Sequence, residues 1–179
     1  MLGKDYPAQD CSLARALEVV GERWTLLILR DAFYGVQRFS DFAAHLGVPR
    51  AVLAERLRSL VEAGLLERRG DSQRPGRAVY ELTPSGKELW PALHALLSWG
   101  ARFSRRPGSP RLFLHAPCGT ALDERGVCPS CDVTAPPEEV LTVGPGEGPL
   151  QGDAVSAALQ GRRRLLEPVA IDSRRAQRA

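Results

Sequence analysis

The sequence has no apolar run long enough to span a membrane. The longest uninterrupted apolar stretch in its helical half is TLLIL at residues 25–29, whereas a membrane helix needs about 20 mainly apolar residues. The N-terminus is acidic and is broken by Pro7, where a signal peptide would have a basic start and an apolar core. We therefore expect a cytoplasmic protein with no membrane partner.

Catalytic motifs are also missing. No Ser/His/Asp arrangement, phosphate-binding glycine loop or pair of catalytic carboxylates rises above chance. Cysteine is scarce, with four in 179 residues. In a reducing compartment, such cysteines are more typical of metal ligands or redox thiols than of structural disulfides. We expect a protein that is not an enzyme.

Lysine is nearly absent, because all the basic residues except Lys4 and Lys87 are arginine. The net charge of +3 is mild, but its distribution is uneven. Residues 48–80 carry seven Arg against four acids, and residues 160–179 carry six Arg against two acids, so the rest of the chain is net acidic. Basic charge concentrated in two segments favours an anionic partner there.

The order of helix and turn signals is the most informative feature of the chain. Apolar periodicity predicts helices over residues 12–20, 24–34, 40–46 and 49–63, separated by glycines, and strands over 66–69 and 77–82 that flank a Gly- and Pro-marked loop. This order predicts a mainly α fold with a small β wing, the winged helix-turn-helix, whose usual task is to bind double-stranded DNA. A small helical bundle with a hairpin is the alternative.

Local signals place several single residues. Ser12 and Ser40 are suited to cap the first and third helices. We expect Trp24 in the core, and His45 and His94 at the surface or at its rim.

Thr83 and Pro84 form a strong helix start, and Pro91 should kink or restart the helix that follows. That helix is very apolar through Phe103. It therefore predicts either a homodimer surface or a segment that folds back over its own core.

The composition changes after residue 106, where short polar stretches and many Gly and Pro begin. His115, Cys118, Cys128 and Cys131 have the spacing of two paired-ligand turns. This spacing predicts a zinc-ribbon-like appendage that holds a structural zinc ion, because a segment so poor in core residues needs such a link to fold. A redox-active Cys128/Cys131 pair and plain thiols are the alternatives.

These observations divide the chain into three parts. Residues 1–106 should form the winged helix-turn-helix with its dimerisation helices, residues 107–135 the zinc-ribbon-like segment, and residues 136–179 a linker and basic tail.

The motifs now described resemble those of the HxlR-type winged helix-turn-helix regulators, which are related to the MarR family. The resemblance covers roughly residues 10–104. It is carried by these pieces: Cys11, Gly21-Glu22-Arg23-Trp24-Thr25, the ILR of the second helix, Gly35 with Arg38-Phe39, the run ERLRSLVEAGLLERR, Tyr80 to Gly86, and Trp99-Gly100. It implies a homodimeric transcriptional repressor or activator that binds an operator near its own or a neighbouring gene.

The polar face of the helix at 49–63 should enter the major groove, whose base edges distinguish all four base pairs. Arg50 and Arg58 suit guanine or phosphate contacts, Glu55 a cytosine amine, and Ala51 a thymine methyl. Ser40 suits a phosphate, and Arg74 and Arg77 of the wing suit the DNA backbone or minor groove. The alternative is a merely solvated helix face.

Cys11 stands apart from the other cysteines. The resemblance implies a sensor of oxidants or electrophiles, and a place at a helix N-terminus lowers a thiol pKa. A small buried side chain is the alternative.

Two further functions compete with regulation of transcription. One is a thiol-redox protein that uses Cys128 and Cys131, although the chain lacks the βαβ context of that motif. The other is a winged-helix module that only dimerises, but no cofactor-binding domain follows it here. The operator, the regulated genes and the effector cannot be read from the sequence.

Overall fold

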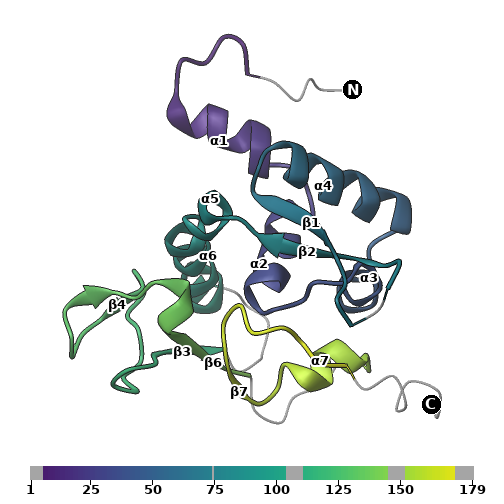
Figure 1. Ribbon diagram of the computed structural model, residues 1–179. Helices are drawn as coiled ribbons and strands as arrows, with labels where there is room; N and C mark the ends of the chain where they lie inside the picture. Colours follow the sequence, from purple (N-terminus) through teal and green to yellow (C-terminus); the bar gives the residue numbers. More distant parts are fainter. Residues whose placement is uncertain (1–5, 74, 104–110, 145–151, 172–179) are drawn as a thin grey trace.

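The computed structural model describes residues 6–73, 75–103, 111–144 and 152–171. Its N-terminal elements are α1 (Ser12–Val20), α2 (Thr25–Phe33), α3 (Phe39–Leu46), α4 (Arg50–Glu62), β1 (Leu66–Gly70), β2 (Ala78–Leu82), α5 (Pro84–Lys87) and α6 (Trp90–Phe103). Its C-terminal elements are β3 (Leu112–His115), β4 (Val127–Cys128), β5 (Val133–Thr134), the short 3-10 helix η1 (Pro137–Glu139), β6 (Val140–Val143), α7 (Ala154–Ala158) and β7 (Arg162–Arg164). The order confirms the predicted winged helix-turn-helix (Figure 1).

The helix-turn-helix consists of α3 and α4 packed on α2. Leu53, Leu57 and Leu60 repeat at helical spacing along α4, and all three are fully buried, as the periodicity predicted. Gly47 ends α3 with a φ of 61°, a left-handed conformation that glycine adopts without the strain of a side chain. Pro49 is the N-cap of α4, and the helix begins at Arg50. Its buried residues lie on one face, so the opposite face does not contact the core.

The wing is the antiparallel hairpin of β1 and β2, with Leu66 opposite Leu82 and Arg68 opposite Tyr80. The backbone N–H of Tyr80 also donates to the carbonyl of Gln37 at 2.8 Å. The hairpin is therefore tied to the segment that leads into α3.

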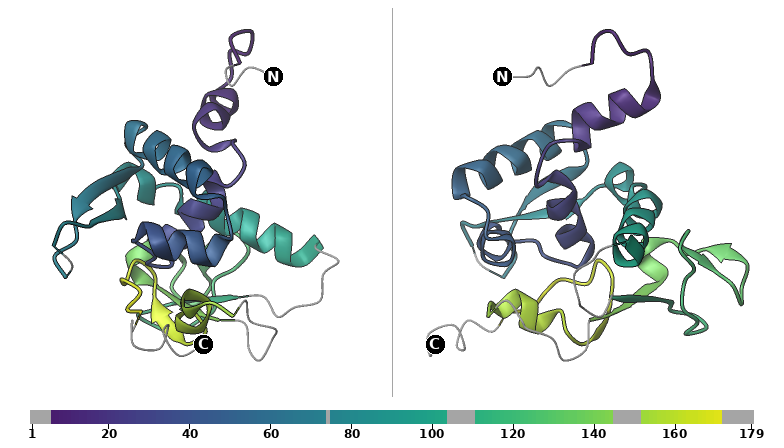
Figure 2. Two further views of the ribbon diagram at one scale, coloured as in Figure 1. Left: turned by 90° about the vertical axis from the view of Figure 1, so that its right-hand side faces the viewer. Right: turned by 180° about the vertical axis from the view of Figure 1, so that it is seen from behind.

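The predicted restart near Pro91 is present, because α5 ends before α6 begins at Trp90. The side chain of Thr83 accepts from the backbone N–H of Gly86 and so caps α5. Trp90 and Leu93 of α6 are buried, whereas Trp99 and Phe103 are 64% and 59% exposed. The N-terminal helix α1 stands away from the body of the molecule (Figure 2). No helix among the described residues is both long and apolar enough to cross a membrane.

The expected linker over residues 136–179 is wrong for the part that the structure describes. β6 is the central strand of an antiparallel sheet with the order β3-β6-β7, and α7 precedes β7. Val140, Leu159 and Leu165 of this part are buried in one hydrophobic cluster with Phe33 and the rest of the winged-helix core. The β-branched run of β6 is buried on alternate residues, and this burial is what makes it a strand rather than a linker.

The junction of the two parts is made by backbone contacts near Gly35. The N–H of Leu166 donates to the carbonyl of Phe33 at 2.7 Å, and the N–H of Val169 donates to that of Gly35 at 2.9 Å. Gly35 has a φ of 86°, and a Cβ there would collide with the carbonyl oxygen of Glu167. Glycine is therefore required at this contact.

Several single-residue expectations need correction. Cys11 rather than Ser12 is the N-cap of α1, because Ser12 is already the first residue of that helix. Arg38 rather than Ser40 is the N-cap of α3, because that helix begins at Phe39. His94 is buried, because the C-terminal part covers α6. Trp24 is only partly buried against the core, with the Arg23 guanidinium over its ring.

Candidate nucleic-acid interface and metal centre

The outer face of α4 carries the side chains that the sequence assigns to DNA. Arg50, Ala51 and Arg58 are exposed, and Glu55 is partly exposed. Arg58 forms ion pairs with Glu55 at 2.6 Å and with Glu62 at 3.2 Å. These carboxylates raise the pKa of the Arg58 guanidinium, the hydrogen bond to Glu55 contributing most. Arg58 must release Glu55 before it can contact a base.

A groove of about 300 Å³ lies where α3, α4 and the wing meet, and we call it the arginine groove. It is lined by Arg38, Phe39, Ser40, Arg50, Arg68, Arg77, Ala78 and Tyr80. The guanidinium of Arg50 lies over the ring of Phe39, 5.1 Å from its centroid. The lining contains four arginines and no carboxylate, so the groove is suited to an anion.

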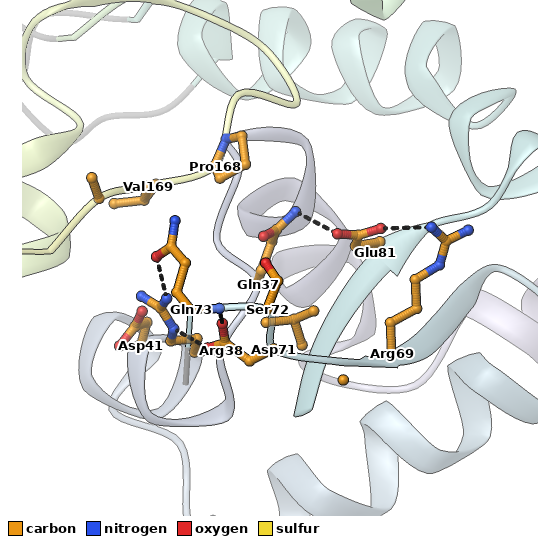
Figure 3. A pocket seen from close by; sticks show the side chains of 13 residues that line it. Gln37, Arg38, Asp41, Arg69, Asp71, Ser72, Gln73, Glu81, Pro168 and Val169 are labelled. Atoms are coloured by element: carbon orange, nitrogen blue, oxygen red, sulfur yellow. Dashed lines mark hydrogen bonds and ion pairs between the residues drawn. The ribbon is translucent and has the colours of Figure 1, made fainter. Parts of the chain in front are cut away.

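A neighbouring cleft of about 360 Å³ on the other side of the hairpin is different, because acids line it together with arginines (Figure 3). Nε of Arg38 donates to the buried carboxylate of Asp71 at 2.8 Å, and Nη2 donates to Gln73 at 3.0 Å. Asp71 also accepts from the N–H of Gln73. Arg38 therefore fixes the tip-side end of β1 to the start of α3, and it acts as a positioning residue for the wing.

The structure brings together only part of the predicted DNA-contacting set. Ser40, Arg50 and Arg77 meet in the arginine groove, and Ala51, Glu55 and Arg58 lie on the α4 face, whereas Arg74 lies outside the described residues. The hydroxyl of Ser40 donates to Asp41 at 2.9 Å, so it does not cap α3.

Sequence reasoning missed Arg38 and Arg68 as members of the groove. Successive side chains of a strand point to opposite faces, which sends Arg68 to the arginine groove and Arg69 to the other cleft. The alternation of side chains along β1 was predictable from the sequence, but which of the two arginines faces the arginine groove was not.

A fully buried carboxylate joins α2 to α3. Asp31 accepts from Arg30 at 2.7 Å and from Nδ1 of His45 at 2.7 Å. His45 therefore lies at the rim of the surface, one of the two placements expected, with its ring turned inward to this acceptor and its side chain 13% exposed. The contact fixes the first helix of the helix-turn-helix against the core.

Four potential metal ligands gather at the turns after β3 and β4. His115, Cys118, Cys128 and Cys131 each offer one ligand atom, and these atoms all lie within 4.8 Å of one another. Cys118 Sγ and Cys128 Sγ are 3.4 Å apart. Tetrahedral zinc with bonds of about 2.3 Å to sulfur separates its thiolates by about 3.7 Å. The donor set and its spacing fit a tetrahedral metal.

The surroundings of the cluster favour a thiolate at Cys118, a protonated thiol at Cys131 and a fixed imidazole at His115. Hydrogen bonds, first of all from Thr120, lower the pKa of Cys118 to about 6, whereas the hydrogen bond with Cys118 raises that of Cys131 to about 11. Nε2 of His115 lies 3.3 Å from Glu139, which leaves Nδ1 on the side of Cys118. A carboxylate on the second ring nitrogen is the usual support for a metal-bound histidine.

Cys11 is exposed, so the alternative of a small buried side chain is wrong. Hydrogen bonds from backbone N–H groups in the first turn of α1 lower the pKa of its thiol. The N–H of Ala14 contributes most, and that of Leu13 contributes less. The thiol is thus open to reagents, and it loses its proton more readily than an unperturbed cysteine side chain does.

Comparisons with other proteins agree with this architecture. Residues 19–107 match the HxlR-like helix-turn-helix family. The chain is 47% identical over 140 residues to Rv3095 of Mycobacterium tuberculosis, an uncharacterized HTH-type transcriptional regulator. The matched region covers 76% of this chain and 87% of Rv3095. YtfH of Escherichia coli, another regulator of this type, is 34% identical over 51% of this chain and 74% of its own.

A solved structure shows the same fold. The crystal structure of PA1607, a candidate transcription factor, superposes with a TM-score of 0.52 at 40% identity, over 55% of this chain and 68% of that one.

Proposed function

This chain belongs to the HxlR-like helix-turn-helix family of transcriptional regulators, and we propose that it binds an inverted-repeat operator as a homodimer through α4 and the arginine groove. The observation that carries the proposal is the groove itself, which gathers Arg50, Arg68 and Arg77 with no carboxylate in its lining, beside an Arg38 that is paired with Asp71. Phosphate contacts of this kind supply most of the affinity of a protein for duplex DNA.

In this arrangement α4 lies in the major groove. Arg50 and Ala51 of its first turn reach base edges or the adjacent phosphate, and Glu55 and Arg58 act further along as a coupled pair. Arg50, Arg68 and Arg77 hold the DNA backbone between the helix and the wing. Ser40 supplies a hydroxyl at the same phosphate.

The test compares two adjacent arginines of β1. Arg68 lines the arginine groove, whereas Arg69 lies on the other face in ion pairs with Glu67 at 2.6 Å and Glu81 at 3.7 Å. Fluorescence anisotropy with DNA that flanks the gene should show weaker binding for Arg68→Ala and a salt dependence smaller by about one unit. Arg69→Ala should retain the affinity of the unmodified protein.

Equal affinities of the two variants would contradict this placement of the DNA surface. Arg58→Ala should cost about 1–3 kcal/mol on the operator if Arg58 reaches a base. A loss at the low end of that range is expected, because the unmodified protein must first break the Arg58–Glu55 ion pair.

Exposed apolar side chains on α1 and α6 support the homodimer. They include Leu13, Leu96, Trp99 and Phe103, each more than half exposed. Trp99→Glu should give a monomer in analytical ultracentrifugation, because a charge in an apolar interface must be desolvated. Leu112→Glu, at an exposed position outside both helices, is the control and should leave the mass unchanged; a Trp99→Glu dimer would refute this interface.

We further propose that His115, Cys118, Cys128 and Cys131 hold one structural zinc ion. The support is the tetrahedral donor set, with Glu139 behind the histidine. When bound, the ion would link the turns after β3 and β4 and so stabilise the appendage. Protein purified without added metal should contain one zinc per chain in elemental analysis. Absence of the metal, together with freely reactive thiols, would favour a redox pair instead.

Cys11 is our candidate for a redox-sensing residue. Its exposure and the backbone N–H groups near its sulfur support this role. Cys11→Ser should bind the operator normally and ignore diamide, while diamide should release the unmodified protein. If the unmodified protein stays bound while its Cys11 is oxidised, Cys11 is not the sensor.

A further inference from the structure

The residues that lead up to Ile171 lie beside the wing. Residues 168–170 line the cleft of about 360 Å³ together with the start of α3 and residues 70–73 of the wing. Figure 3 shows Pro168 and Val169 at the edge of this cleft. α7, which precedes this segment in the chain, contacts α3. The chain beyond Ile171 therefore starts next to the wing and the helix-turn-helix.

This starting point is held against the winged-helix core. Val169 is buried, and its N–H donates to the carbonyl of Gly35 at 2.9 Å. Ile171 is partly buried and packs against the hydrophobic core. A chain end that is tied down by backbone hydrogen bonds and apolar packing keeps its place. The point from which the following residues extend is therefore fixed relative to the wing.

Residues 172–179 lie outside the described part of the structure, but their sequence, DSRRAQRA, is net basic. It contains Arg174, Arg175 and Arg178 against Asp172. An extended chain spans about 3.3–3.6 Å per residue at most, so these residues reach up to about 28 Å from Ile171. The major groove of DNA is only about 12 Å wide. Arginines on this segment can therefore reach phosphates on both sides of a groove.

The cleft itself offers these arginines little free negative charge. Asp71 pairs with Arg38 at 2.8 Å, and Glu81 lies 3.7 Å from Arg69. Arg38 lines both this cleft and the arginine groove, so the two cavities adjoin. A DNA backbone held in the arginine groove would therefore run close to the start of residues 172–179. Its phosphates supply the unpaired negative charge that the cleft lacks.

We propose that residues 172–179 act as a basic arm that binds the DNA backbone next to the wing. The inference rests on the proposed DNA-binding function and adds a contact to those of α4 and the arginine groove. The arm pairs its guanidinium groups with phosphates, which carry no sequence information. It therefore adds affinity for any duplex and increases the salt dependence of binding. The arm lies beyond residue 107, where the match to the family ends.

The test is the full-length double variant Arg174→Ala/Arg175→Ala. Its binding is measured by fluorescence anisotropy over a series of salt concentrations, with a duplex of the DNA that flanks the gene and with a duplex of random sequence. We expect the affinity for both duplexes to fall by on the order of tenfold at low salt. The slope of log K against log salt should become smaller by up to about 1.8, since each phosphate contact contributes about 0.9.

The matched control is Arg125→Ala/Arg164→Ala, which removes the same charge from exposed side chains that line neither the cleft nor the arginine groove. The turn before β4, which contains Arg125, lies on the opposite side of the molecule from the wing loop (Figure 1). The control should keep the affinity and the salt slope of the unmodified protein, because charges more than about 10 Å apart are largely screened.

A charge-conserving variant separates phosphate pairing from a structural role of the two side chains. Arg174→Lys/Arg175→Lys should bind both duplexes like the unmodified protein, because lysine keeps the charge. Loss of affinity in this variant equal to that of the alanine variant would overturn the phosphate contact.

The proposal is overturned if Arg174→Ala/Arg175→Ala loses no more affinity and no more salt slope than the control. It is also overturned if this variant binds DNA more tightly, a result expected if residues 172–179 occupy the cleft and compete with DNA. Arg68→Ala separates the arm from the proposed function: a loss in Arg68→Ala alone would refute only the arm, and a loss in the arm variant alone would refute only the arginine groove. An unmodified protein that binds neither duplex would refute both.

Discussion

Replacement of Asp31 by alanine should be among the most destabilising changes in the helix-turn-helix. The carboxylate is fully buried and accepts from Arg30 and His45. Removal of one partner from a buried ion pair costs about 3–5 kcal/mol. The Arg30 side chain is 24% exposed and can turn to solvent, so we expect a value of about 3 kcal/mol. In a chain of this size, that loss lowers the unfolding midpoint by about 6–12 °C.

His45→Ala should cost less, about 1.5 kcal/mol, because Asp31 keeps its bonds to Arg30. In the double variant the hydrogen bond is lost only once, so the two losses should not add, and the coupling energy should be about 1 kcal/mol. Asp41→Ala is the control, since the Asp41 carboxylate accepts a hydrogen bond from the exposed Ser40 hydroxyl at the surface of α3. Thermal and urea unfolding followed by circular dichroism give the four values. Two results would refute the contribution of the buried Asp31 contacts: stability losses of the two single variants that add in the double variant, or an Asp31→Ala midpoint within 2 °C of that of the unmodified protein.

Three other changes have defined outcomes. Gly35→Ala should destabilise the junction, because a Cβ at its φ of 86° meets the Glu167 carbonyl; hydrogen exchange should rise at the Leu166 and Val169 amides, and unchanged exchange would contradict the contact. The pKa of Cys11 is lowered from that of an unperturbed cysteine side chain, so iodoacetamide at pH 7 should alkylate Cys11 faster than the cysteine of a short unstructured peptide with the same flanking residues; a slower reaction would refute this. Removal of zinc by a chelator should lower the unfolding midpoint of metal-containing protein and leave that of a Cys118→Ser variant unchanged; equal shifts would place the metal elsewhere.

The winged helix was predictable because its signals are local. The stripe of Leu53, Leu57 and Leu60 repeats within one helix, and Thr83 with Pro84 marks a helix start wherever it occurs. The wing needed only two short strands around a Gly- and Pro-marked loop. The clustering of the four candidate metal ligands was likewise predictable, because paired ligands at such spacing occur in two tight turns.

The remaining features depend on contacts between distant segments. Val140–Val143 was taken for linker because it is short and lies between Pro- and Gly-rich stretches, and only its pairing with β3 and β7 makes it a central strand. His94 is buried by Asp123 and Phe113, which follow it by some twenty residues or more. Arg38 was not recognised as a positioning residue, because its partner Asp71 is 33 residues away. Periodicity contains no information about such pairs.

The match to the family ends at residue 107, but Val169 is hydrogen-bonded to Gly35 across this limit. We therefore expect the parts of the chain before and after residue 107 to unfold together. Phe33 and Trp90 each have aromatic or apolar neighbours on both sides of that boundary, with Phe113 only 5.3 Å from Trp90. Shortening the chain there would expose these faces to water, and heating the whole chain should give one calorimetric transition rather than two. A shortened chain would therefore need polar substitutions at these core positions to remain folded in water.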